Sequence, residues 1–465
     1  MRKWLPLFAT CLGTLMLLID VTIVTVALPD IAADLGGGLS GLQWVMDGYA
    51  LALAALLLVF GAVADRFGAK RTYLAGLAVF AGASLMCGMA GSISILVAAR
   101  ALQGIGGAAM LTTTLSLLHT TYSGRDRGIA FGVWGAVAGA AAGTGVVLGG
   151  VLTGTLSWPW IFLVNLPIAA VAISLSAVVF PASRQRRETS VDLPGMVAFA
   201  LAATAVTFGV IRGGEHGWTD WRAVAALTTA AVCALAFVRI ETGSAAPMFP
   251  PALLGNRTFG ATVLGATGQT FAAFAATPLI SLWLQQQLQL SPIRAGLAML
   301  PLAATAFVVA GAFGRVLHSA APRWTIGAGL VVIGTGALLT TLIDSGSTWT
   351  ALIPGFVVIG VGVGVNAPVL AAVGMAAVPP HQAGTASGAI NTARQLGMAL
   401  GVAVLGTVFR SAAGDAVTAA DVARGLDTAG VVAGSVGIGA GIVSFALLSR
   451  RTPARAAAPE PAVAA

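Results

Sequence analysis

The stretch GAVADRFGAKR, from Gly61 to Arg71, decides the fold of this chain. It lies between two apolar runs, at residues 51–64 and 73–90, so we expect it to form a short loop at one face of a bilayer. Its cations are Arg66, Lys70 and Arg71. Short loops rich in Lys and Arg stay on the inner side of the membrane, which predicts that this face is cytoplasmic.

Three other residues give this loop more than a topological role. Gly61 allows a neighbouring helix to approach, and Gly68 allows a sharp reversal of the chain. Asp65 adds nothing to the positive-inside signal, yet it lies at the end of a predicted helix. We therefore predict that the loop has a role beyond setting the topology. The alternative is a loop that only sets the topology.

The composition indicates a helical membrane protein with many spans. Of the 465 residues, 57% are hydrophobic and only 9% are charged. The net charge of +8 comes from cations in predicted cytoplasmic segments, so we expect the lipid bilayer and no nucleic acid as a partner. The three cysteines lie inside apolar runs, which argues against a disulfide framework or a metal site.

Apolar runs and breakers predict an all-α fold with fourteen membrane spans. Residues 1–182 form an N-terminal half of six spans, and residues 258–450 form a C-terminal half of six. Residues 183–257 hold two extra spans, and residues 451–465 form a tail expected to be disordered. The predicted spans are 7–28, 42–64, 73–92, 94–118, 129–152, 159–180, 194–212, 222–240, 258–283, 294–317, 324–343, 349–373, 388–410 and 430–449.

The placement of Lys and Arg supports this topology. Most of the 24 basic residues fall in segments that are cytoplasmic when the N terminus is inside. Both termini are then cytoplasmic, and the chain is expected in the plasma membrane. Glycine-rich segments also recur eight spans apart, as at residues 104–110 and 360–368. Two similar halves suit alternating access, although generic glycine packing is the alternative.

Ionisable residues inside spans are costly and therefore candidates for function. Helical rise puts Asp20 ~13 Å, Arg100 ~9 Å and Asp47 ~8 Å below the outer surface. We predict that these three take part in proton coupling, and that Arg100 has a carboxylate partner. Asp20 could instead be a hydrogen-bonded structural residue, and Asp47 a solvated residue at a helix start. The sequence has no catalytic constellation and no phosphate-binding loop, so we expect no enzyme and no cofactor.

Five motifs resemble one known family. GAVADRFGAKR resembles the signature loop between spans two and three of the major facilitator superfamily, with Ala69 at a usually basic position. IDVTIVTVALP around Asp20, RALQGIGGAAM from Arg100 and NTARQLGMALG at residues 391–401 resemble segments of its fourteen-span drug:proton antiporters. GAAAGTGVVLGG resembles their span-five antiporter motif. It keeps Gly145, Gly149 and Gly150, but Val146 replaces the usual proline.

The resemblance implies proton-driven efflux of small amphipathic drugs or antibiotics, as in actinobacterial exporters, by a monomer that uses the proton gradient. A proton-coupled importer of a small metabolite is the alternative within transport. The candidates for substrate contact are Gln269, Phe271, Phe274 and Asn366, which could equally be packing residues.

Arg394 lies in the thirteenth predicted span, about six residues, or ~9 Å, from its cytoplasmic start. The resemblance implies that this span packs near span two, so we predict a latch between Asp65 and Arg394 when the cytoplasmic side is closed. The predicted conformational gate consists of this pair together with Gly61, Arg66, Gly68, Lys70 and Arg71. The alternative is that Arg394 contacts lipid headgroups or a backbone carbonyl.

Overall fold

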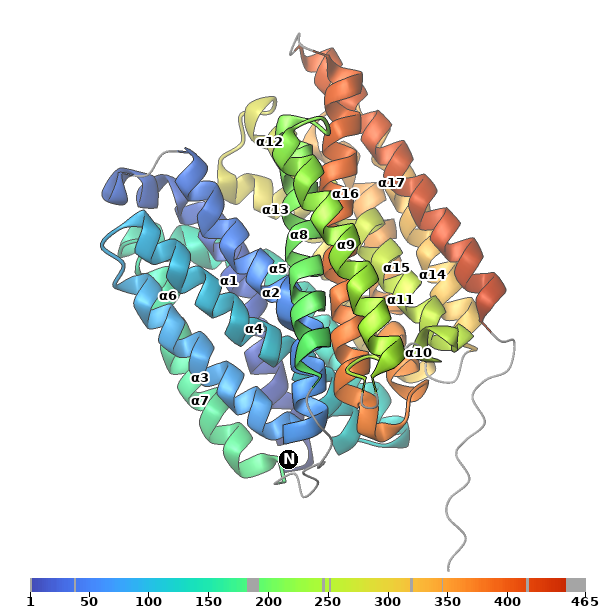
Figure 1. The fold of residues 1–465 in the computed structure, drawn as a ribbon. Helices are drawn as coiled ribbons and strands as arrows, with labels where there is room; N and C mark the ends of the chain where they lie inside the picture. The colour runs from blue at the N-terminus through green and yellow to red at the C-terminus, as the bar shows by residue number, and fades with distance from the viewer. Residues whose placement is uncertain are drawn as a thin grey trace, which may run out of the picture.

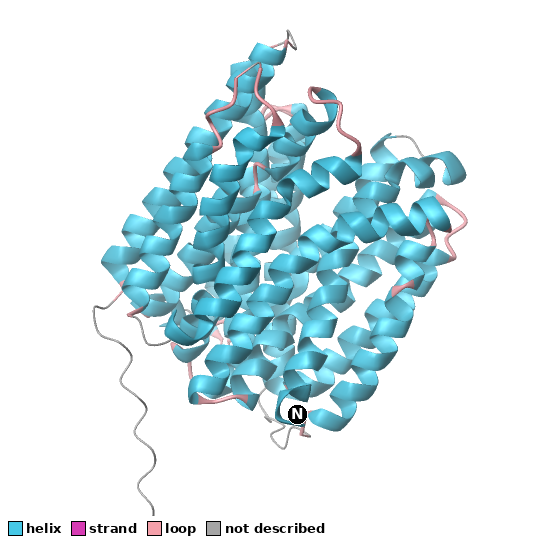
Figure 2. Ribbon diagram, turned by 180° about the vertical axis from the view of Figure 1, so that it is seen from behind, coloured by secondary structure: helices cyan, strands magenta, loops and turns pink. Residues whose placement is uncertain are grey.

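The computed structural model describes residues 2–36, 39–181, 192–244, 247–250, 252–317, 321–344, 346–414 and 418–448. The predicted tail at 451–465 therefore lies outside the described residues. Within these ranges the chain is helical and contains no strand (Figure 2). The all-α prediction is confirmed.

Long apolar helices make up each part of the chain. The first part contains α1 (Leu5–Leu35), α2 (Leu39–Phe67), α3 (Ala69–Gly88), α4 (Ile93–Thr121), α5 (Gly124–Thr155), α6 (Trp160–Leu163) and α7 (Asn165–Val179). The middle contains α8 (Leu193–His216), α9 (Trp221–Gly243) and α10 (Ala252–Gly255). The last part contains α11 (Arg257–Phe274), α12 (Thr277–Gln286), α13 (Pro292–Leu317), α14 (Pro322–Leu339), α15 (Ile353–Ala376), α16 (Ala383–Ala413) and α17 (Ala419–Leu447).

Polar side chains define where several helices begin. Asp192, Asp220, Asn256 and Thr418 each accept hydrogen bonds from backbone N–H groups in the first turn of α8, α9, α11 and α17, respectively. These groups have no partner within the helix, so a side-chain cap stabilises the first turn.

Helices with the same sequence offset pack in the same way in the two parts. α1 packs on α5 and α7, and correspondingly α11 packs on α16 and α17. α4 packs on α2 and α3, and correspondingly α15 packs on α13 and α14. The two bundles meet where α2 contacts α16 and where α5 contacts α13 (Figure 1). These pairings follow the eight-span offset of the glycine-rich segments.

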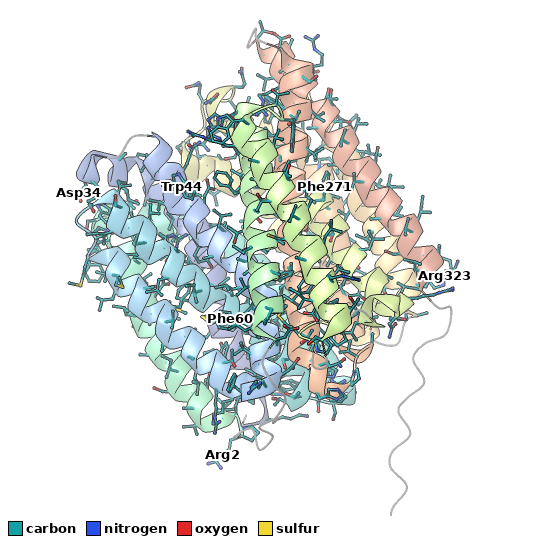
Figure 3. The ribbon with its side chains drawn as sticks, in the orientation of Figure 1. Arg2, Asp34, Trp44, Phe60, Phe271 and Arg323 are labelled. Carbon is teal, nitrogen blue, oxygen red and sulfur yellow. The ribbon has the colours of Figure 1, made fainter. Side chains whose placement is uncertain are left out.

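The pair α8 and α9 lies against the junction of the bundles (Figure 1). α8 contacts both α2 and α16. Trp44 of α2 stacks on Phe208 of α8 with 6.2 Å between ring centroids, and the label of Trp44 in Figure 3 marks this edge. On the other bundle, Trp218 Nε1 donates a hydrogen bond to Thr407 Oγ1 at 2.9 Å. The extra pair therefore touches both halves.

Twelve helical segments of the described chain are long and apolar enough to cross a membrane. The expectation of fourteen is not confirmed by this count, because α3 and α5 are not among the twelve. Both are nevertheless long, with 20 and 32 residues. In Figure 1 the chain begins at the same end of the molecule as α17 finishes, as an even number of crossings requires.

We predict that α3 and α5 also cross the membrane, which single-cysteine variants can test. In a background without Cys11, Cys87 and Cys233, Gly91→Cys after α3 and Ser157→Cys after α5 should react with an impermeant maleimide in intact cells. Ser123→Cys, between α4 and α5, should react only after permeabilisation. Protection of Gly91→Cys in intact cells would show that α3 does not cross.

Candidate functional site

A buried ion pair joins α1 to α4. Arg100 Nη1 lies 2.5 Å from Asp20 Oδ2, and both side chains are fully buried, with 0% exposure. The carboxylate partner predicted for Arg100 is therefore Asp20. α1 continues through Pro29 to Leu35, so Asp20 lies near the middle of the helix rather than in its outer part. Proline is tolerated inside membrane helices, which is why it does not mark the end of this one.

Three amide and hydroxyl side chains complete this polar cluster. Gln103 Nε2 donates to Asp20 Oδ1 at 2.7 Å and to Ser84 Oγ at 2.9 Å. Asn165 Nδ2 donates to the same oxygen of Asp20 at 3.2 Å. Because Ser84 lies on α3 and Asn165 on α7, the cluster as a whole connects four helices, and the carboxylate of Asp20 itself joins α1 to α4 and α7. None of the three was predicted from the sequence; the only signal was a polar side chain in an apolar span, one helical turn from Arg100 in the case of Gln103.

The guanidinium of Arg100 also has partners that do not depend on Asp20. Nε donates to the carbonyl of Val45 at 3.1 Å, and Nη1 donates to Gln103 Oε1 at 2.7 Å. The group lies 4.3 Å from the ring centroid of Tyr49, close enough for a cation–π contact. Arg100 Nη2 and the Tyr49 hydroxyl are buried and have no hydrogen-bond partner in the described part of the chain. Arg100 can thus stay bound in the site when Asp20 is neutral, although Nη2 already lacks a partner.

Asp47 does not belong to this cluster. It is half-buried on α2, and the hydrogen bonds of Asp20 and Arg100 go to other residues. The structure therefore brings together two of the three residues predicted for proton coupling.

The end of α2 and the start of α16 are joined by Asp65. Its carboxylate oxygens accept hydrogen bonds from the backbone N–H groups of Gly384 at 2.6 Å and Thr385 at 2.7 Å. These donors belong to the first turn of α16, where the helix dipole favours a negative charge. Asp65 therefore stabilises the contact between the two halves at this face.

Glycines allow the backbones of α2 and α16 to touch beside Asp65. A Cβ atom on Gly61 would lie 2.6 Å from the carbonyl oxygen of Gly384, and one on Gly388 would lie 2.7 Å from that of Leu57. Gly61 thus permits the close approach that was predicted for it. Gly384 and Gly388 were missed because the sequence alone does not show which helices meet.

The remaining loop residues have distinct environments. Gly68 has a φ of +96°, a conformation that favours glycine and turns the chain into α3. Lys70 Nζ donates to the carbonyls of Ala177 at 2.7 Å and Phe180 at 2.5 Å, at the last turn of α7. Arg66 lies 5.3 Å from the ring centroid of Phe67, and Arg71 is exposed. Lys70 thus ties the loop to its own half.

Comparison with known proteins identifies the family. The model of the Major Facilitator Superfamily matches residues 10–402. This chain belongs to the Major Facilitator Superfamily. It is therefore a multi-pass membrane protein of a transporter family, not a member of an enzyme family.

Curated relatives are named as resistance and export proteins. The chain is 35% identical over 406 residues to the multidrug resistance protein Stp of Mycobacterium tuberculosis, covering 87% of this chain and 75% of Stp. It is 35% identical to the cephamycin export protein CmcT of Amycolatopsis lactamdurans, covering 98% and 94%. It is 31% identical to the methylenomycin A resistance protein of Streptomyces coelicolor, covering 87% and 85%.

A solved structure has the same fold. The human organic anion transporter MFSD10 superposes with a TM-score of 0.68, covering 95% of this chain and 99% of that one. At 16% sequence identity this similarity concerns the fold alone.

The glycines of the predicted antiporter motif let α5 pack closely on its neighbours in this superfamily member. A Cβ atom on Gly149 would lie 3.1 Å from the carbonyl oxygen of Ile23 in α1, and Gly145 likewise meets Thr22. A Cβ atom on Gly150 would lie 2.9 Å from the side chain of Ile293 in α13. The side chain of Val146 lies outside the described residues.

Arg394 does not pair with Asp65, so the predicted latch is wrong in this conformation. α16 begins at Ala383 rather than at residue 388, which puts Arg394 ~16 Å along the helix, beyond the reach of Asp65. Its Nη2 instead donates to the carbonyl of Ala367 at 3.5 Å, and its guanidinium lies 5.7 Å from the ring centroid of Trp134. The contact with the carbonyl of Ala367 agrees with the alternative that Arg394 binds a backbone carbonyl. Asp65 is held by the N terminus of α16 instead.

The four candidates for substrate contact lie inside the C-terminal bundle. Phe271 is buried and Phe274 is half-buried, both within the apolar core of that bundle; Figure 3 labels Phe271. Gln269 and Asn366 are buried, with 3% and 0% exposure. The Oε1 atom of Gln269 and both amide atoms of Asn366 have no hydrogen-bond partner among the described residues. The two phenylalanines thus pack in the core, whereas the two amides have unused hydrogen-bonding capacity.

Proposed function

We propose that this chain exports small amphipathic drugs or antibiotics in exchange for protons across the plasma membrane. The relatives are named for drug resistance and export, which supports efflux over the alternative of nutrient import. The observation that carries the proton coupling is the fully buried ion pair between Asp20 and Arg100. A buried carboxylate in a membrane is costly, and such residues commonly form proton sites.

In this proposal, protonation of Asp20 changes the packing of the N-terminal half. A proton from the outer side neutralises the carboxylate and removes its ionic bond to Arg100. Asp20 then keeps only hydrogen bonds with Gln103 and Asn165, while Arg100 keeps Val45 and Tyr49. α1 can thereby shift relative to α4. Release of the proton to the cytoplasm restores the pair and resets the transporter.

The contact between α2 and α16 serves as the cytoplasmic gate in this mechanism. In this proposal the hydrogen bonds of Asp65 and the glycine contact around Gly61 and Gly384 keep the gate closed. Access from the cytoplasm requires that these two helices separate. Arg66, Gly68, Lys70 and Arg71 fix the loop that carries Asp65, and the glycines of α5 let α1 and α13 move against it. Both termini lie in the cytoplasm.

The direct test is the energy source of efflux. In a drug-sensitive host that expresses this chain, an uncoupler should abolish drug extrusion even when cellular ATP is maintained, because the proton gradient drives transport. The measurement is the rate of efflux of a preloaded fluorescent drug. Undiminished extrusion without a proton gradient would reject antiport, and gradient-driven accumulation of the drug would favour an importer.

A further inference from the structure

The unusual charge in the C-terminal half is Arg394. It lies on α16, which is 31 residues long, and ~16 Å from the cytoplasmic start of that helix. This depth is well within the hydrocarbon region, where a charged side chain normally pairs with an opposite charge or with well-placed backbone carbonyls. The other deep arginine, Arg100, follows this rule through Asp20.

Arg394 has no carboxylate partner among the described residues. Its side-chain contacts are the carbonyl of Ala367 at a long 3.5 Å and the ring of Trp134, and its buried Nε has no hydrogen-bond partner. Acidic residues are also scarce in this half of the sequence. Between Glu241 and Asp415 the only one is Asp344, which bonds to Gly346 and Ser347 of its own loop. Within the part of the chain that the structure describes, this cation therefore has no counter-charge.

The position of Arg394 is the junction of the two bundles. Trp134 belongs to α5, and its Nε1 donates to Thr14 of α1 at 3.1 Å, so the ring is fixed by the N-terminal bundle. Ala367 belongs to α15 of the other bundle. Arg394 is half-buried as a residue, although its Nε is buried. A substrate path in a transporter of this architecture runs along such a junction.

We infer that Arg394 binds an anionic group of the exported compound, and that the substrates include aromatic carboxylic acids. A guanidinium recognises a carboxylate through charge-assisted hydrogen bonds, and the free Nε and weakly bonded Nη2 supply donors for them. The ring of Trp134 offers a flat apolar surface beside the charge. The anion supplies the counter-charge that the described residues do not provide. This inference rests on the proposed function, because it names the substrate class of the same transporter.

Equilibrium binding to the purified full-length protein tests this inference without a proton gradient. The probes are pyrenebutyric acid and its methyl ester, which differ in charge at one end of the same aromatic body. Wild-type protein should bind the acid more tightly than the ester. Arg394→Gln should weaken binding of the acid by about 10- to 100-fold, the range of one charged hydrogen-bonding contact, and leave the ester unchanged. Arg394→Lys keeps the charge and should give an intermediate affinity.

Two controls test whether the preference for the acid depends on the charge at Arg394. Arg410→Gln removes a cation near the external end of the same helix and should leave both affinities unchanged. Replacing gluconate with chloride in the buffer should not remove the preference for the acid; if it does, the site binds an inorganic anion and the inference fails. Equal loss of acid and ester in Arg394→Gln, an unchanged affinity for the acid, or no binding of the acid by wild-type protein would also overturn it. If the acid binds as expected but drug efflux does not depend on the proton gradient, only the proposed proton coupling is rejected.

Discussion

Asp20→Asn is expected to reduce gradient-driven efflux to the level of cells that lack the protein. Asn has nearly the same shape as Asp and can still hydrogen-bond with Gln103 and Asn165, but it cannot bind and release a proton at this position. The measurement is drug efflux from proteoliposomes with an imposed pH gradient. Exchange of labelled for unlabelled drug without a gradient should persist, because it does not need the proton cycle.

A second variant distinguishes loss of proton coupling from loss of stability in Asp20→Asn. That variant leaves Arg100 buried without a counter-charge, which can cost about 3–5 kcal/mol of stability. The double variant Asp20→Asn/Arg100→Gln removes both charges and should accumulate in the membrane, exchange drug and still lack gradient-driven efflux. Normal coupled efflux by either variant would place the proton site elsewhere, with Asp47 as the next candidate.

Gly384→Val is expected to lower the rate of efflux by roughly tenfold or more. A shift of ~1.4 kcal/mol in the equilibrium between the closed and open states of the α2–α16 contact lowers the occupancy of the closed state tenfold. An added Cβ would meet the carbonyl oxygen of Gly61 and lie 2.7 Å from Asp65 Oδ1, so α2 and α16 could not close at the cytoplasmic face. The protein should then remain open on that side. Two quantities are measured. The first is the rate of efflux. The second is the reactivity of Ser387→Cys, a fully buried position on α16, toward a maleimide added from the cytoplasmic side, which should rise in Gly384→Val.

The matched control for this variant is Gly82→Val on α3. A Cβ there meets no atom within 4 Å, so the same change in side chain should leave both efflux and the reactivity of Ser387→Cys unchanged. If Gly384→Val transports normally, or if Ser387→Cys stays protected, then closure of α2 on α16 does not limit transport.

The sequence by itself determined the class of this protein and its family. The chain has many long apolar runs and only 9% charged residues. This pattern indicates a bundle of membrane-spanning helices. The motif around Asp65 and the segments around Asp20 and Arg100 pointed to the superfamily that the family match shows. The scarcity of charges also singled out Asp20 and Arg100, because each is conspicuous in an apolar helix.

The tertiary structure alone decided which side chains meet. Helical rise gives the depth of a residue, provided that the ends of the helix are known, but it gives neither the direction of a side chain nor the neighbouring helix. Ser84, Gln103 and Asn165 therefore could not be assigned to Asp20 in advance. α16 begins five residues earlier than predicted, so Arg394 lies farther from Asp65 along the helix. The first turn of α16 is the partner of Asp65 instead. The partners of Asp20 and of Asp65 both depend on long-range packing between helices, which a local sequence pattern does not show.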